Sequence, residues 1–155
     1  MHQAIRHLHV KAPTRGLVEF TADVREFVHQ ASIQTGILTL FCRHTSASLL
    51  IQENADPSVR RDLEAYFGTL APEDLTRYEH DTEGPDDMPA HLRTALTQVQ
   101  LSIPVEHGRM TLGTWQGIYL FEHRRLPQTR DIVAHLIASD ERSCSSCAPQ
   151  DSARR

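Results

Sequence analysis

Residues 37–53 of this 155-residue chain read ILTLFCRHTSASLLIQE. The apolar run at 37–43 is short and continuous, which is typical of a strand in the centre of a sheet. Polar residues interrupt the run, and residues 47–53 then predict a second strand. Polar side chains lie at or near this strand end, namely His44, Ser46 and Ser48. Strand ends are a usual position for site residues on a rigid scaffold, so this stretch is expected to supply part of a site.

Short alternating or apolar segments predict six further strands, at residues 4–10, 17–21, 100–105, 110–112, 118–124 and 130–138. A turn at 13–16 joins the first two, which we expect to form a hairpin. His107 and Gly108 join the third and fourth into a second hairpin. Gly113 and Gly117 interrupt the pattern before the next strand and permit a bulge or a close approach to a ligand.

Apolar residues that recur with the period of a helix predict three helices. The first spans residues 23–34 and ends at Gly36. The second begins at Pro57 after the cap residue Asp56 and ends before Gly68. Its buried stripe is expected to contain Val59, Leu63, Tyr66 and Phe67. The third helix begins at Pro89, and its buried stripe is expected to contain Leu92, Ala95, Leu96 and Val99.

This order of elements, with hairpins and few crossovers, predicts an α+β domain with a mainly antiparallel sheet and helices packed on one side. Closure into a barrel or a symmetric oligomer would cover the edges of so many strands. The chain length fits a single domain at residues 1–139. The polar segment at 140–155, which contains Cys144 and Cys147, is expected to be a disordered tail.

The composition limits the classes of partner. With 16 basic and 20 acidic residues the formal charge is -4, which gives no global electrostatic case for nucleic acid or an anionic membrane. No apolar run approaches the roughly 20 residues of a membrane span, and the first residues lack the apolar stretch of a signal peptide. Three cysteines do not form a disulfide framework. We therefore expect a cytoplasmic protein.

Residues 80–91 read HDTEGPDDMPAH and place two histidines and four acidic residues around a Gly-Pro turn. The segment is predicted to be a loop that runs into the third helix, with His91 in the first helical turn. Carboxylates and imidazoles are ligands of divalent cations, which indicates a metal or phosphate site. The alternative is a solvated acidic loop in which Asp86 or Asp87 only caps the helix.

Ten histidines are an outlying count for this length, and His44, His80 and His91 each lie beside a turn. Three neutral imidazoles with one open position would form a catalytic zinc-type site, with Asp87 or Glu53 as an outer partner or base. Each histidine taken singly also has a structural or solvated interpretation.

Five phrases resemble the YjbQ family, also called the secondary thiamine-phosphate synthase family. They are HTSASL at 44–49, ENADP at 53–57, His80 with EGPDDMPAH at 83–91, GTWQGI at 113–118 and EHR at 122–124. The resemblance covers about residues 3–139. It implies a compact α+β fold, a homotrimer and a metal-binding histidine cluster near a subunit boundary.

The resemblance also implies that a hydroxymethylpyrimidine diphosphate is joined to a thiazole phosphate, with release of diphosphate. Such an enzyme must neutralise the leaving diphosphate and hold the two rings in line. A divalent metal ion held by His44, His80 and His91 would neutralise the diphosphate, with Arg124 as a phosphate partner. Three histidines favour zinc, whereas diphosphate chemistry commonly uses magnesium.

The other site residues are assigned by the same resemblance. Trp115 offers a stacking face, Ser46 and Ser48 contact the substrate, and hydrogen bonds or proton transfer are assigned to Glu53, Asp87 and Gln116. Each has a structural alternative: Trp115 in the core, Arg124 paired with Glu122, and Asp87 as a cap.

Two other functions fit the same residues. An open histidine site beside a carboxylate would also suit a metal-dependent hydrolase of small phosphorylated or acylated metabolites. The absence of a recognisable nucleophile arrangement would suit a non-enzymatic trimeric module that binds a metal or metabolite.

Overall fold

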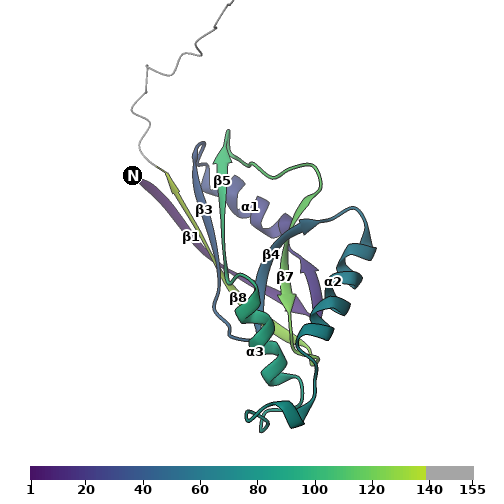
Figure 1. The fold of residues 1–155 in the computed structure, drawn as a ribbon. Helices are drawn as coiled ribbons and strands as arrows, with labels where there is room; N and C mark the ends of the chain where they lie inside the picture. Colours follow the sequence, from purple (N-terminus) through teal and green to yellow (C-terminus); the bar gives the residue numbers. More distant parts are fainter. Residues whose placement is uncertain (139–155) are drawn as a thin grey trace, which may run out of the picture.

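Two antiparallel sheets and three α-helices make up residues 1–138, the part of the chain that the computed structural model describes (Figure 1). The strands are β1 (His2–Ala12), β2 (Gly16–Glu19), β3 (Gly36–Cys42), β4 (Ala47–Glu53), β5 (Gln100–Glu106), β6 (Arg109–Met110), β7 (Gln116–Glu122) and β8 (Gln128–Ala138). The helices are α1 (Thr21–Ala31), α2 (Pro57–Leu70) and α3 (Asp87–Leu96), with a short 3-10 turn η1 (Leu75–Arg77). The predicted α+β class with antiparallel sheets is confirmed.

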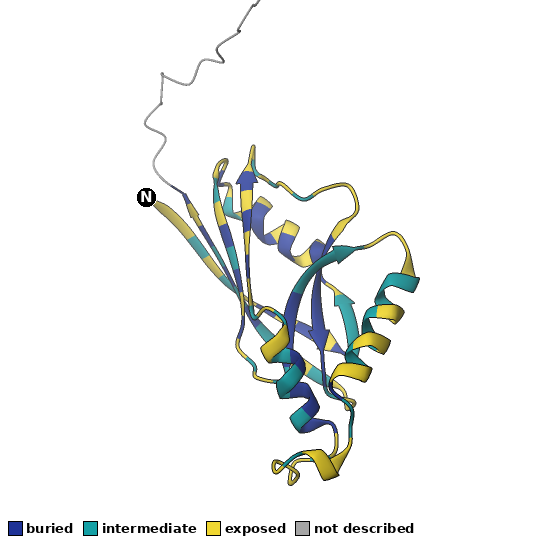
Figure 2. Cartoon of the chain, in the orientation of Figure 1, coloured by how far each residue is buried: buried dark blue, intermediate teal, exposed yellow. Residues whose placement is uncertain are grey.

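The five-stranded sheet has the order β1-β8-β3-β5-β6, and the three-stranded sheet has the order β2-β7-β4. The larger sheet turns its even-numbered residues of β1, β3 and β8 inward, including Leu38, Leu40 and Ile132. β7 lies in the centre of the smaller sheet and is buried from residue 117 to residue 122 (Figure 2). Burial on both faces explains its continuous apolar sequence, since no face of the strand needs to be polar.

The hairpin predicted for the first two strands is wrong. β1 pairs with β8 along its whole length, from His2 opposite Ala138 to Ala12 opposite Gln128, whereas β2 pairs with β7. The turn before Gly16 therefore transfers the chain from one sheet to the other. A turn signal fixes where the chain bends, but the hydrogen-bonding partner of each strand is set by pairing far along the sequence.

The second predicted hairpin is confirmed, although its return strand β6 contains only two residues. His107 and Gly108 have φ angles of 50° and 71°. Positive φ at both central residues is the signature of a type I′ turn, whose twist matches that of the strands it joins. The turn also donates a hydrogen bond of 2.9 Å from Gly108 N to Gln34 O.

Three helix boundaries differ from the prediction by a few residues. α1 runs from Thr21 to Ala31 and ends at Ser32, which is left-handed with a φ of 55°, rather than at Gly36. The predicted cap and first residue of α2, Asp56 and Pro57, are confirmed, but the helix continues through Gly68 to Leu70. α3 begins at Asp87, so His91 lies in its second turn rather than its first.

The buried stripes predicted for α2 and α3 are wrong in part. No residue of α2 is fully buried, and Tyr66 is 60% exposed. In α3 the residues that turn inward are Asp87, Pro89, Ala90 and Arg93, while Leu96 is 62% exposed. Arg93 can turn inward because Glu64 of α2 accepts a hydrogen bond of 3.0 Å from its Nη1. The buried face of α3 therefore combines the paired charges of Asp87 and Arg93 with the apolar residues Pro89 and Ala90.

Besides Asp87 and Arg93 of α3, buried polar residues also lie at the end of β7. Arg130 donates from Nε and Nη2 to the two carboxylate oxygens of Glu122, each at 2.6 Å. His123 is buried, with its Nε2 2.9 Å from Ser48 Oγ. Its Nδ1 has no hydrogen-bond partner among the described residues. An imidazole with so few partners is expected to be neutral.

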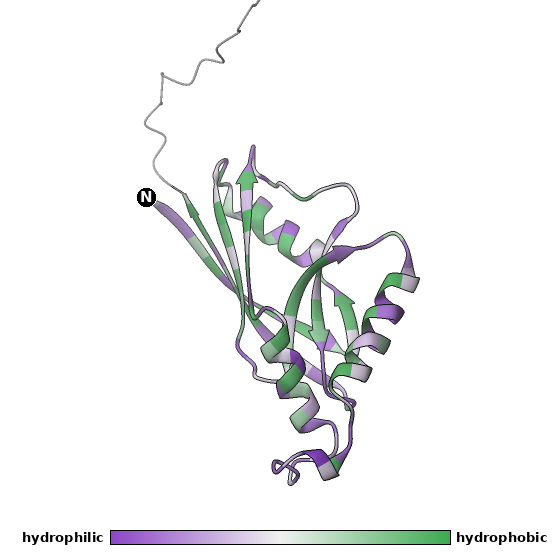
Figure 3. Ribbon diagram, in the orientation of Figure 1, coloured by the Kyte–Doolittle hydropathy of each residue, from purple (hydrophilic) through white to green (hydrophobic). Residues whose placement is uncertain are grey.

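Hydrophilic residues dominate the segment that precedes α3, whereas the strands are largely hydrophobic (Figure 3). Within residues 1–138 no helix has the length and apolar character needed to cross a membrane. Cys42 is buried and unpaired, and burial raises the pKa of its thiol. The predicted tail at residues 140–155, with Cys144 and Cys147, lies outside the described residues.

We predict that acid destabilises the fold through His123. Burial, and then the charges of Arg93, Arg130 and Arg15, lower its pKa from 6.5 to about 3. Between those pH values the unfolded chain binds a proton that the native state does not, so stability falls as the pH falls, by at most about 1.4 kcal/mol per pH unit. Urea unfolding at a series of pH values measures this slope.

The variant His123→Gln should lose this slope, because its amide can still bond to Ser48 but does not titrate. The variant His9→Ala, which alters an exposed histidine on β1, should keep it. An unchanged pH dependence in His123→Gln would show that another group is responsible.

Candidate metal centre

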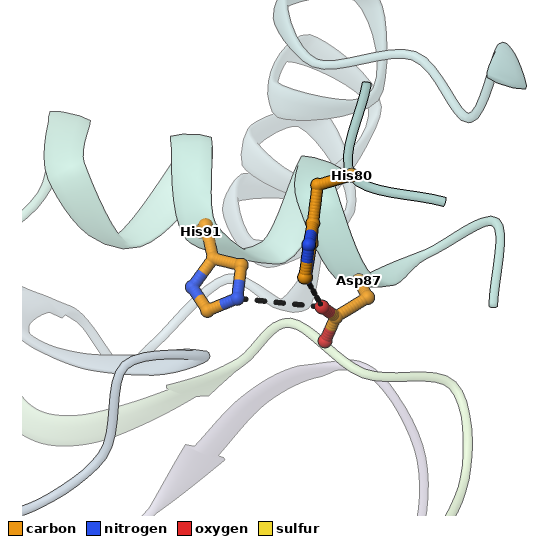
Figure 4. A group of neighbouring side chains, drawn as sticks. All are labelled: His80, Asp87 and His91. Carbon is orange, nitrogen blue, oxygen red and sulfur yellow. Dashed lines mark hydrogen bonds and ion pairs between the residues drawn. The ribbon is translucent and has the colours of Figure 1, made fainter. Parts of the chain in front are cut away.

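Helix α3 and the segment that precedes it bring His80, Asp87 and His91 together (Figure 4). Asp87 and His91 are four residues apart on α3, a spacing that places both side chains on one face of a helix. His80 comes from the segment that precedes the helix. One ligand atom from each of the three residues lies within 4.8 Å of the other two.

The two imidazoles converge on one carboxylate oxygen. Asp87 Oδ2 is 2.7 Å from His80 Nε2 and 3.3 Å from His91 Nε2. The Asp87 side chain is only 3% exposed, whereas those of His80 and His91 are 43% and 36% exposed. The group therefore has a buried carboxylate on one side, and its other side is open to solvent.

A backbone carbonyl fixes the orientation of His91. Its Nδ1 is 3.1 Å from Thr45 O, and since a carbonyl can only accept, Nδ1 carries the hydrogen. In the neutral ring Nε2 then has a lone pair, and an ion lying between Nε2 and Asp87 Oδ2 would use that lone pair. An N–H donated to a carbonyl on the side away from the ligand position is the usual arrangement of a metal-binding histidine.

Arg124 holds the carboxylate from the other side. Its Nη1 pairs with Asp87 Oδ1, its Nε donates to Asp86 Oδ2 at 3.2 Å, and its Nη2 donates to Glu83 O at 2.9 Å. Burial tends to raise the pKa of Asp86, but hydrogen bonds from the Arg125 N–H and from Arg124 lower it below its ordinary value. Asp86 makes no side-chain cap bond to α3, because both arginines bind its carboxylate instead.

His44 lies outside the group, so the three-histidine ligand set predicted from the sequence is not assembled in the structure. Its Nε2 accepts a hydrogen bond of 2.8 Å from Asp131 N, and a nitrogen that accepts this bond cannot also bind a metal. Its Nδ1 is 3.5 Å from Arg130 Nη1. Burial, and then the charge of Arg130, lower the pKa of His44 and keep the ring neutral.

The two predicted serines have structural partners. Ser46 Oγ accepts a hydrogen bond of 3.1 Å from Arg130 Nη2. Ser48 is fully buried against His123, so a substrate would not reach it in this conformation.

The other predicted site residues lie at the far end of the smaller sheet. Glu53 and Gln116 are opposite each other where β4 and β7 pair, and Trp115 precedes β7 and is 63% exposed. The group of His80, Asp87 and His91 lies near the end of β7 that carries Glu122. The seven residues of β7 separate the two ends by roughly 20 Å. Within one chain Glu53, Trp115 and Gln116 therefore do not join the group.

A groove of about 780 Å³ opens beside His91. Its walls come from the end of β3 and from α3, and they include Phe41, His44, His91, Ala95 and Val99. This volume is within the range of small-molecule sites, which are largely apolar with a few polar groups. The group thus has an adjacent surface on which an organic ligand could bind.

The group is oriented partly by the backbone carbonyls of Thr45 and Glu83, for which no residue type gives a signal in the sequence. The buried Arg130, outside the group, does have such a signal: in β8 it shares the inward parity of Ile132 and Ala134, so it faces inward and needs a buried anion, which is Glu122.

Comparison with known proteins gives consistent matches along the described part of the chain. The family model for UPF0047 protein YjbQ-like matches residues 6–139. A UPF0047 protein of Synechocystis sp. is 49% identical over 135 residues, which cover 87% of this chain and 90% of that protein. The YjbQ protein of Escherichia coli O157:H7 is 42% identical over 130 residues, covering 83% of this chain and 94% of that protein.

Solved structures match as well. A YjbQ/UPF0047 family protein from Clostridium acetobutylicum has a TM-score of 0.77 at 32% identity, covering 85% of this chain and 99% of that one. A conserved hypothetical protein from Thermus thermophilus has a TM-score of 0.73 at 37% identity, covering 83% of this chain and 97% of that one.

We predict that His91→Ala and Asp87→Asn each weaken zinc binding at least about 100-fold, the upper end of what loss of an outer partner costs a metal site. Arg124→Gln should weaken it about tenfold, because Arg124 only positions Asp87. Competition against a zinc indicator dye measures all three affinities.

The matched control is His9→Ala, which removes an exposed histidine of β1 outside the group and should bind zinc like the unmodified protein. Circular dichroism of each variant establishes that it is folded. Zinc affinity unaltered by His91→Ala would remove this group as the metal site.

Proposed function

Because the chain belongs to the YjbQ-like UPF0047 family, we propose that it is a metal-dependent enzyme whose metal ion is bound by His80, Asp87 and His91. The proposed reaction joins a hydroxymethylpyrimidine diphosphate to a thiazole phosphate with release of diphosphate, as the resemblance to the family implies. The convergence of two imidazoles and one buried carboxylate is the observation that carries the proposal.

The donor set fits zinc better than magnesium. Two imidazole nitrogens and one carboxylate oxygen are the ligands of catalytic zinc sites, which leave a further position open. Magnesium prefers an oxygen environment with several waters. We therefore propose zinc as the ion, and the solvent-exposed side of His80 and His91 as the side from which a ligand enters.

The bound ion would supply positive charge to neutralise a phosphate oxygen. The residues around it have separate tasks under this proposal. Arg124 holds Asp87 in place, and the Thr45 carbonyl holds His91. The groove beside His91, with Phe41 and Val99 in its walls, would bind an aromatic ring of the substrate.

One observation favours a metal-dependent hydrolase as a second candidate. The expected phosphate partner Arg124 already donates to Asp86, Asp87 and Glu83, so a leaving diphosphate would have to displace these contacts. A hydrolase of a small phosphorylated or acylated metabolite needs the ion, a water and an open side, and does not need a second cation.

We also propose that the protein is a homotrimer. The face of the larger sheet with the odd-numbered residues of β1, β3 and β8 carries four exposed apolar side chains: Ile5, Ile37, Phe41 and Ile137. An exposed apolar face of this kind is typical of an association surface. Under this proposal Glu53, Trp115 and Gln116 take part in the site only if a neighbouring copy supplies them, because they do not reach the group in their own chain.

We predict that light scattering finds three copies per particle and that Phe41→Lys lowers the mass toward that of one chain, because a buried unpaired charge is unfavourable in an interface. The control Tyr66→Lys alters an exposed aromatic residue on α2, outside this face, and should leave the mass unchanged. A single-chain mass for the unmodified protein would contradict the trimer.

We predict that the zinc-loaded protein forms thiamine phosphate from the two phosphorylated substrates, and that a chelator or His91→Ala abolishes this activity, because either removes the ion. Product is measured by chromatography, with His9→Ala as the active control. If no product forms while zinc is bound, the transferase proposal fails. Turnover of model phosphate esters that depends on zinc would then favour the hydrolase, and binding of the pyrimidine without turnover would favour the binding module.

A further inference from the structure

A cavity of about 800 Å³ lies on the opposite side of the folded domain from the start of α3 (Figure 1). It is formed by α1, the β5–β6 turn and the segment that leads into β7. It shares no lining residue with the groove beside His91. The cavity is therefore separate from the candidate metal centre.

The cavity is lined by cationic and imidazole side chains without any carboxylate. Arg25 and His29 come from α1, and His107 and Arg109 come from the β5–β6 turn. No described carboxylate forms an ion pair with Arg25 or Arg109. In a chain with a formal charge of -4, the two arginines make this a locally basic surface within the described residues.

The backbone fixes the position of the turn residues. His107 is a non-glycine residue with a φ of 50°, a left-handed conformation that is uncommon outside glycine. The turn is held against the end of α1 by the hydrogen bond from Gly108 N to Gln34 O. The positive φ belongs to the type I′ turn itself, and the turn fixes where the backbone of His107 and Gly108 lies beside α1.

The rest of the lining suits a small organic molecule. Val28, Met110 and Leu112 give an apolar part, and Ser32, Asn54 and Thr114 give neutral hydrogen-bonding groups. Two guanidinium groups match the charge and the three oxygens of a phosphate monoester, since arginine binds phosphate through paired hydrogen bonds. The volume is within the range of sites for such ligands.

We propose that this cavity is a binding site for a small organic phosphate monoester, with Arg25 and Arg109 as the phosphate partners. The inference rests on the cavity and its charge, and it does not depend on the function proposed for the metal centre.

Calorimetric titration of the full chain with phenyl phosphate tests this site. A chelator is present throughout, so that a metal ion cannot provide the binding. We expect saturable binding to one site per chain, and about tenfold weaker binding for each of Arg25→Gln and Arg109→Gln, the usual effect of losing a charge-assisted hydrogen bond. The control Arg77→Gln alters an exposed arginine outside the cavity and should bind like the unmodified protein.

Three results would overturn the proposal: no saturable binding, unaltered affinity in the double variant Arg25→Gln/Arg109→Gln, or equal weakening by Arg77→Gln. Benzoate and phenol test the ligand class. Benzoate binding as tightly as phenyl phosphate would refute the preference for phosphate, and phenol binding as tightly would refute recognition of the anion.

Discussion

The carboxylate of Asp87 is almost completely buried at the first residue of α3, and a buried charge is stable only when it is paired. Arg124 pairs with one oxygen, and the other oxygen faces His80 and His91. This pairing holds the first turn of α3 against the protein, and the pairing of Arg93 with Glu64 holds its second half, while Leu96 turns to solvent. The same contacts that orient the helix therefore assemble the candidate metal centre.

The smaller sheet separates two regions of different charge. At the Glu122 end of β7, acidic side chains and imidazoles form a group suited to a cation, whereas the cavity near Gln116 contains arginines and histidines suited to an anion. Gly117 is close to the second region, but a Cβ there would lie 2.9 Å from Glu19 Oε1 and 3.2 Å from Asn54 Cβ. The close approach expected at this glycine is thus made by the protein's own side chains.

Much of the fold could be predicted because strand and helix periodicity are local. The strands at β3, β4 and β8 and the N-terminal cap of α2 follow from short patterns. The partner of β1 could not be predicted, since an 11-residue strand at each end of the domain must meet by long-range pairing. The sequence predicted His80 and His91 as ligands and Asp87 as an outer partner or base, whereas the structure groups Asp87 directly with the two histidines. His44 was assigned to the group although a backbone N–H already binds its Nε2. Local sequence shows which side chains can bind a metal, but not which of them have other partners in the fold.

X-ray absorption at the zinc edge of the zinc-loaded protein tests whether His80, Asp87 and His91 bind the ion. A centre formed by these three residues should give nitrogen and oxygen ligands at about 2.0–2.1 Å, with the outer scattering of two imidazoles. A ligand shell containing sulfur at about 2.3 Å would place the zinc on cysteine and would contradict a centre formed by His80, Asp87 and His91. A spectrum with no imidazole contribution would contradict it equally.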